Sequence, residues 1–293
     1  MRFKLRHLTH YGYQRPVSFA RCNIRLRPIA WPGQTVINSN LTATPDGVFS
    51  EATRQSELVT LSRLVLSGAI RQIDIVSSAE VDLHRLVPML DPTDASIEHV
   101  AAEARSSSDI SDLSPANFLY PSPLIALDHQ IAAWCAPWLH PGRPATLAAM
   151  DLALAIQRDF TFDPDATRTE TLPVEAFAKR AGVCQDFAQI MISGLRSAGI
   201  PAAYASGYIR TIPPPGQARL QGADAMHGWV LAWCGSARGW IGFDPTNGIL
   251  MAGDHLLVAV GRDYLDISPI DGIFTGYGAR EIRVEVDFIP QIN

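Results

Sequence analysis

Apolar and polar residues alternate with a period of two through much of the first 90 residues. The alternation is clearest at residues 3–8, 23–27 and 70–76. Turn-forming clusters that contain proline, at 31–33 and 45–47, separate these segments. A period of two puts successive side chains on opposite faces of a strand. The pattern therefore predicts an N-terminal antiparallel β domain over residues 1–90.

From residue 123 onward the apolar residues recur at three- and four-residue spacing, which is typical of amphipathic helices. Helices are predicted at 124–138, 145–160, 174–179 and 184–198. Strands are predicted after them, at 202–209, 227–234, 239–243, 256–260 and 282–289. Helices followed by a mainly antiparallel sheet indicate an α+β core over residues 123–293. A polar segment at 91–122 is expected to link the two parts through a short helix.

Composition and charge limit the binding partners and the cellular locations that we expect for this protein. The chain has 293 residues, a net charge of −5 and a pI near 5.9. We expect no nucleic-acid partner, since no strongly basic field is present to replace counterions. We also expect neither export nor a membrane anchor, because no apolar run approaches the roughly 18 residues that a transmembrane helix needs. The four cysteines are scattered and favour a reducing, cytoplasmic setting.

Cys184 is the first candidate for chemistry, because it stands at the start of the predicted helix 184–198. A thiol becomes a strong nucleophile when a histidine accepts its proton and a third polar group orients that histidine. His227 and Asp244 can supply these two roles. The unpaired N–H groups and the positive end of the helix favour a thiolate and can also stabilise an oxyanion. A buried structural cysteine is the alternative, and the neighbouring residues weigh against it.

A predicted hairpin explains how His227 and Asp244 could meet. The strand that begins at His227 and the strand that ends at Asp244 are joined by a turn at 234–239. If Trp233 faces Trp240, the same register puts Asp244 diagonal to His227 on one face of the sheet. A slip of one residue would put the two side chains on opposite faces. The assignment of this pair therefore depends on the register.

Other residues beside these three are given narrower roles. Gln185 could donate a hydrogen bond to the oxyanion or lie in solvent, and Trp229 could contact the substrate or shield the histidine–aspartate pair from water. Asp186 is expected to be an exposed or capping carboxylate of the first helical turn. The remaining histidines, including His255, are interpreted as structural. Neither a metal site nor another cofactor is expected, because the cysteine–histidine pair has no further ligands at zinc-like spacing.

Several motifs carry a resemblance to a known family. They are Gly182-Val183-Cys184-Gln185-Asp186-Phe187-Ala188, residues 199–208, His227-Gly228-Trp229 and residues 242–248, together with 1–11 and 260–269. Over nearly its whole length the chain resembles the bacterial transglutaminase-like proteins, a family of candidate cysteine peptidases. The resemblance implies a papain-like core with Cys184 as nucleophile, His227 as general base and acid, and Asp244 as the orienting residue. Gly228 departs from the family, in which alanine more often follows the histidine.

The predicted activity is cysteine-dependent acyl transfer on amide or peptide bonds through a thioester at Cys184. Hydrolysis is preferred, because water is abundant and no feature of the chain excludes it. A protein-glutamine transglutaminase, in which an amine takes the acyl group, is one alternative, and a non-catalytic binding protein on the same fold is another. The expected partner is a peptide or protein substrate, and the proline-rich segment 212–217 is expected to border its cleft. The sequence does not indicate an oligomeric state.

Overall fold

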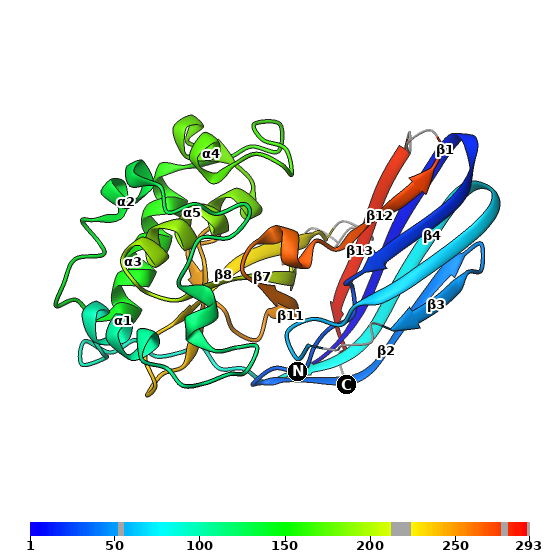
Figure 1. Cartoon of the computed structure of the whole chain (residues 1–293). Helices are drawn as coiled ribbons and strands as arrows, with labels where there is room; N and C mark the ends of the chain where they lie inside the picture. The colour runs from blue at the N-terminus through cyan, green and yellow to red at the C-terminus, as the bar shows by residue number, and fades with distance from the viewer. Residues whose placement is uncertain (52–55, 212–223, 277–280, 292–293) are drawn as a thin grey trace, which may run out of the picture.

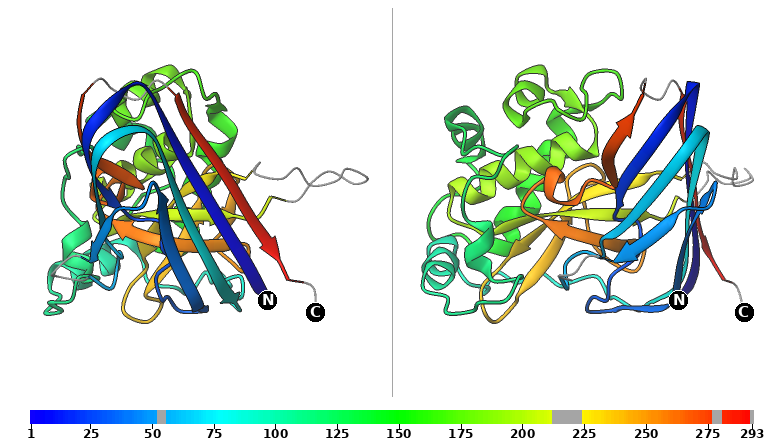
Figure 2. Two further views of the ribbon diagram at one scale, coloured as in Figure 1. Left: turned by 90° about the vertical axis from the view of Figure 1, so that its right-hand side faces the viewer. Right: turned by 45° about the vertical axis from the view of Figure 1, so that its right-hand side comes forward.

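The computed structural model describes residues 1–51, 56–211, 224–276 and 281–291, so the proline-rich segment 212–217 lies outside the described residues. A sheet of long strands stands on one side of the molecule, helices gather on the other, and a smaller sheet lies between them (Figure 1). The right-hand view of Figure 2 shows the same separation, and the left-hand view looks onto the N-terminal sheet with the core behind it. This arrangement of helices and mainly antiparallel sheets confirms the predicted α+β class.

Six strands form the N-terminal sheet. They are β1 (Arg2–Ile24), β2 (Gln34–Thr44), β3 (Val48–Glu51), β4 (Ser62–Leu83), β12 (Ile270–Thr275) and β13 (Glu281–Pro290). Phe3, Leu5 and His7 of β1 are buried, whereas Lys4 and Arg6 between them are exposed. This is the burial that a period of two requires, so the alternation predicted the strand correctly.

The end of the chain returns to this N-terminal sheet. β13 pairs with β1 from Phe3 to Gly12, and β12 pairs with β1 from Phe19 to Ile24. We predicted the strand at 282–289 within the core, and its pairing shows that this placement is wrong. Because β1 has 23 residues, β13 can pair with its first half and β12 with its second half along the same edge. Periodicity predicts a strand but does not reveal its partner.

Five strands form the sheet of the core, in the order β10-β9-β8-β7-β11. They are β7 (Ala202–Ile209), β8 (Met226–Trp233), β9 (Trp240–Asp244), β10 (Ile249–Leu250) and β11 (His255–Gly261). All their pairings are antiparallel. β7, β8, β9 and β11 confirm strands that the sequence predicted. A separate parallel pair consists of β5 (Thr161–Phe162) and β6 (Ala181–Gly182).

The helices are α1 (Ile97–Arg105), α2 (His129–Cys135), α3 (Ala145–Asp159), α4 (Pro173–Lys179) and α5 (Cys184–Ser197), with short 3-10 turns η1 (Pro115–Phe118) and η2 (Tyr264–Ile267). Helices α3 and α5 pack against the core sheet, and α2 and α4 pack on α5. The predicted helix at 124–138 is too long, because α2 starts only after its cap at Asp128. The N–H of Leu124 instead donates to Asp263 Oδ2 at 2.9 Å. None of the described helices combines the length and apolar content needed to cross a membrane.

Helix α5 runs through the centre of the core. Its residues from Asp186 to Arg196 are all buried, the polar ones included. The Arg196 guanidinium compensates its burial by donating to the carbonyls of Ala202 and Arg262, at 2.8 and 2.6 Å. The helix ends before Gly199, whose φ of 83° suits glycine, so the predicted end is confirmed.

The N-terminal sheet and the core share one apolar interior. Phe3 stacks on Phe288 with ring centroids 4.6 Å apart, and both belong to the same buried cluster as Ile190 of α5. Gln34, also buried, accepts from the Leu257 N–H at 2.9 Å and donates to the Leu257 carbonyl at 2.7 Å. Leu257 lies on the edge strand β11, so the N-terminal region covers an edge of the core sheet.

Candidate active site

Cys184 begins α5, and a buried aspartate fixes the chain that leads into it. Oδ2 of Asp186 accepts a hydrogen bond from the Val183 N–H at 2.8 Å and from the Thr167 hydroxyl at 2.6 Å. Gly182 leaves room for this carboxylate, since a Cβ there would lie 2.5 Å from Oδ2. Asp186 is therefore a capping carboxylate, as predicted, and it is buried rather than exposed.

Cys184 differs from the other three cysteines in its surroundings. All four thiols are free, and Cys184 is half-buried while the others are buried. Burial raises the pKa of Cys22 to about 11 and the pKa values of Cys135 and Cys234 to about 12. These three thiols are therefore poor nucleophiles near neutral pH. Cys184 combines solvent access with a place at a helix N-terminus.

The hairpin of β8 and β9 has the predicted register. Trp233 pairs with Trp240, and Val230 pairs with Phe243. Nε2 of His227 lies 2.7 Å from Oδ2 of Asp244. The histidine is 8% exposed and the aspartate 0%, so their contact is protected from water. The expectation that these two side chains meet across the hairpin is confirmed.

His227 also reaches the thiol. Its side chain makes a hydrogen bond with Cys184. Because Nε2 faces Asp244, the nitrogen left for the thiol is Nδ1. With its proton on Nε2, the neutral ring can accept the thiol proton at Nδ1. The structure thus brings together the three residues that the sequence singled out.

Asp244 is held by a set of donors. Its Oδ1 accepts from the N–H groups of Thr246 and Asn247, at 3.0 and 3.2 Å. Its Oδ2 accepts from Nδ2 of Asn247 at 2.7 Å and lies 3.3 Å from Nε2 of His255. Burial raises the pKa of Asp244, but the bonds from His227, His255 and Asn247 outweigh it and lower that pKa far below its ordinary value. Asp244 is a fixed, ionised acceptor.

Sequence reasoning missed the contacts of Asn247 and His255 with this aspartate. Asn247 lies in the predicted turn three residues after Asp244, and asparagine in such a turn is a usable signal. His255 comes from β11, and no local pattern indicates its contact. One ring nitrogen of His227, an Asp244 oxygen and one ring nitrogen of His255 lie within 4.8 Å of one another, a spacing that could also hold a metal ion. Here hydrogen bonds join the three groups.

The charge of His227 makes stability depend on pH. Burial lowers the pKa of His227, but its hydrogen bonds and attraction to Asp244 and Cys184 raise it to about 10. Since the unfolded value is about 6.5, the stabilising contribution is complete below that pH and is lost as the pH rises to about 10. We expect the stability advantage of the wild type over His227→Gln, measured by urea unfolding, to shrink between these pH values. A constant difference would contradict the raised pKa.

Gln185 and Trp229 occupy different places around the site. Gln185 is half-buried, and its amide donates to the Thr169 carbonyl at 2.9 Å. Trp229 is fully buried, stacks on His227 with ring centroids 6.0 Å apart, and donates its indole N–H to Met251 Sδ at 3.2 Å. The structure thus places Trp229 behind the imidazole, where it excludes water and cannot touch a substrate. The first backbone N–H groups of α5 have no acceptor within the helix and are available to an oxyanion.

The space beside position 228 explains why this residue is glycine in this chain. A Cβ at this position would lie 2.2 Å from the hydroxyl oxygen of Tyr204. Tyr204 is itself buried on the neighbouring strand β7, so its ring cannot easily move aside. In this chain the Tyr204 hydroxyl therefore occupies the space that the methyl group of an alanine at position 228 would need, and glycine stands where alanine is common in the family.

Comparisons with known proteins agree with this geometry. The transglutaminase-like superfamily matches residues 133–245, and the bacterial transglutaminase-like N-terminal region matches residues 3–82. An uncharacterized protein of Mycobacterium tuberculosis is 31% identical over 300 residues, which cover 99% of this chain and 93% of the relative. The chain belongs to the transglutaminase-like superfamily. The cysteine, histidine and aspartate of this transglutaminase-like protein all lie within the matched residues 133–245.

Two further proteins are similar to this transglutaminase-like protein. A protein-glutamine gamma-glutamyltransferase of Pseudomonas aeruginosa is 35% identical over 116 residues, 38% of this chain and 17% of that protein. The crystal structure of a candidate cysteine protease from Cytophaga hutchinsonii covers 100% of this chain and 92% of its own, with a TM-score of 0.76 and 20% identity. At this identity the second match shows a shared fold, including the N-terminal sheet.

Proposed function

We propose that this transglutaminase-like protein is a cysteine-dependent enzyme that transfers the acyl group of an amide or peptide bond to water. The observation that carries the proposal is the chain of contacts from Cys184 through His227 to Asp244. Each group has the environment its role needs: the thiol is half-exposed, the imidazole is nearly buried, and the carboxylate is fully buried.

The arrangement supports a two-step mechanism. Nδ1 of His227 first takes the thiol proton and holds it as the imidazolium that its raised pKa favours. Sγ of Cys184 then attacks the substrate carbonyl carbon, and the N–H groups at the start of α5 stabilise the oxyanion. The C–N bond then breaks, and the imidazolium gives its proton to the departing amine. A thioester on Cys184 remains. His227 next takes a proton from water, which attacks the thioester, releases the acid and restores the thiol.

Water is the proposed acceptor of the acyl group, and a peptide or protein is the proposed substrate. Cys184 is half-exposed, so solvent can reach a thioester at this position. The shared fold with a candidate cysteine protease supports the same choice. An amine acceptor is the second candidate, and the match to a protein-glutamine gamma-glutamyltransferase favours it. The two functions share the first step and differ in the second.

A peptide library offered together with a biotin-labelled primary amine separates these functions. Products are read by mass spectrometry for the wild type and for Cys184→Ser. Hydrolysis predicts cleaved or deamidated peptides without the label, formed by the wild type alone. Peptides that carry the label on glutamine and are not cleaved would show that the reaction is transamidation and not hydrolysis. The absence of every product across the library would contradict enzymatic function and favour a binding protein.

A further inference from the structure

His255 lies against the aspartate of the active site, and we propose that it is a positioning residue for the reaction at Cys184. The inference rests on the proposed function. His255 begins β11, is 1% exposed, and has its Nε2 3.3 Å from Oδ2 of Asp244. His227 contacts the same oxygen at 2.7 Å. Two imidazoles therefore share one carboxylate oxygen.

The hydrogen bonds of His255 define its tautomer. The backbone N–H of Ala252 points to Nδ1 of His255 at 3.5 Å. An N–H can only donate, so Nδ1 is the acceptor in this contact. The proton of the neutral ring then lies on Nε2, directed at Asp244. His255 thus contributes an uncharged donor to the carboxylate.

An uncharged donor suits this position. Asp244 raises the pKa of His227 through its hydrogen bond and its negative charge. A second cation beside Asp244 would weaken that effect, whereas a neutral N–H holds the oxygen and leaves its charge in place. Loss of the donor would leave Oδ2 less firmly fixed, and the bond to His227 less well aligned.

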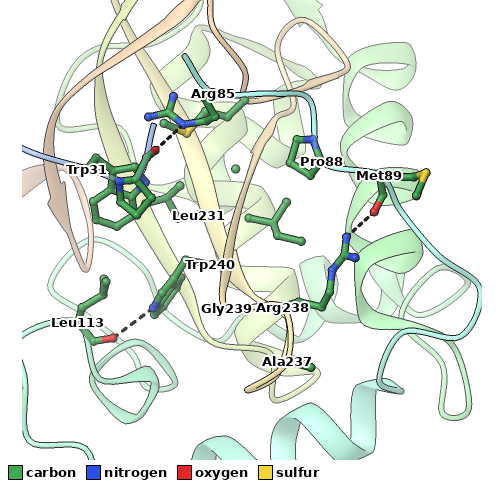
Figure 3. Close-up of a pocket in the computed structure, with 14 residues that line it drawn as sticks. Trp31, Arg85, Pro88, Met89, Leu113, Leu231, Ala237, Arg238, Gly239 and Trp240 are labelled. Carbon is green, nitrogen blue, oxygen red and sulfur yellow. Dashed lines mark hydrogen bonds between the residues drawn. The ribbon is translucent and has the colours of Figure 1, made fainter. Parts of the chain in front are cut away.

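The N-terminal region holds the segment that carries His255. Arg85 lies beside Trp31 at one side of a cavity of about 650 Å³ (Figure 3). Its Nη1 donates to the carbonyls of Ala252 and His255, at 3.3 and 3.2 Å. The same arginine therefore anchors both residues that set the tautomer. His255 has little freedom to turn away from Asp244.

Two substitutions of His255 test the role. Leucine removes the donor, while glutamine can restore an N–H toward Asp244 and an acceptor toward Ala252. We expect His255→Leu to slow the alkylation of Cys184 by iodoacetamide near pH 6 by roughly five- to tenfold. His255→Gln should restore the rate to within about twofold of the wild type. In hydrolysis, kcat should fall for His255→Leu while KM stays constant, because the buried ring cannot touch a substrate.

His7→Leu is the matched control, since His7 is also buried, 2% exposed, and bonded to the Tyr208 hydroxyl at 2.8 Å. It should lower stability without slowing alkylation. Equal alkylation rates in His255→Leu and the wild type would overturn the proposal. A rate in His255→Gln as low as that in His255→Leu would overturn it as well.

A measurement on the wild type keeps the proposal testable if the leucine variant does not fold. Nitrogen NMR of histidine-labelled protein should show His255 neutral and protonated on Nε2, and a proton on Nδ1 would overturn the proposed donor. Wild-type Cys184 that alkylates no faster than Cys22 would instead overturn the proposed function, and the inference about His255 with it.

Discussion

Cys184→Ser is expected to lower the rate of amide hydrolysis by at least about 10⁴-fold. A hydroxyl is a much weaker acid than a thiol, and His227 and Asp244 are arranged to accept a thiol proton. The serine variant should fold normally, because residue 184 is half-buried and contributes little packing. The measurement is kcat/KM on a peptide identified from the library, with circular dichroism as the check on folding.

Cys22→Ala is the control for the loss of a cysteine as such. Cys22 is buried in the N-terminal sheet, far along the chain from the active site, so its replacement should lower stability modestly and leave kcat/KM within about twofold. Retention of more than a tenth of the wild-type rate by Cys184→Ser would contradict nucleophilic catalysis at this residue.

Asp244→Asn is expected to lower kcat by about 10³- to 10⁴-fold. Oδ1 of Asp244 faces the N–H groups of Thr246 and Asn247, and Oδ2 faces His227. An asparagine is uncharged and turns its NH₂ group either toward those two N–H groups or toward His227, His255 and Nδ2 of Asn247. Either orientation sets a donor against donors, and the loss of the negative charge removes the attraction that raises the pKa of His227. His227 is then a weaker base toward the thiol.

The fall in kcat for Asp244→Asn should not be accompanied by a comparable change in KM. KM should change little, because Asp244 is 0% exposed and cannot touch a substrate. Asp159→Asn is the matched control: it also removes one negative charge, from an exposed pair with Arg158, and should leave kcat within about twofold. A similar fall in both variants would show a general effect of charge and contradict the role of Asp244.

The parts of the site that sequence could predict are those set by local chemistry. The hairpin register follows from a short turn and from the pairing of Trp233 with Trp240, and it alone decides whether His227 and Asp244 share a face. The helix at Cys184 follows from its apolar spacing and from the glycine that ends it. The strand period and the turn were therefore sufficient to pair His227 with Asp244, whereas the approach of Cys184 to this pair depends on the packing of α5 on β8.

The parts that sequence could not predict depend on contacts between distant segments. The strand at Glu281–Pro290 pairs with β1 at the other end of the chain, and no periodicity distinguishes that partner from a core strand. The bond between the Leu124 N–H and Asp263 joins residues 139 positions apart, and it lies in a segment that was predicted to be helical. The contact of His255 with Asp244 likewise arises only when β11 is placed.

Activation of Cys184 by His227 can be measured as the rate at which iodoacetamide alkylates this cysteine near pH 6. We expect wild-type Cys184 to react at least about tenfold faster than Cys184 in His227→Ala. We also expect Cys22, whose pKa burial raises to about 11, to stay unreactive in both proteins. Equal rates at Cys184 in the wild type and in His227→Ala would contradict this activation and leave Cys184 an ordinary thiol.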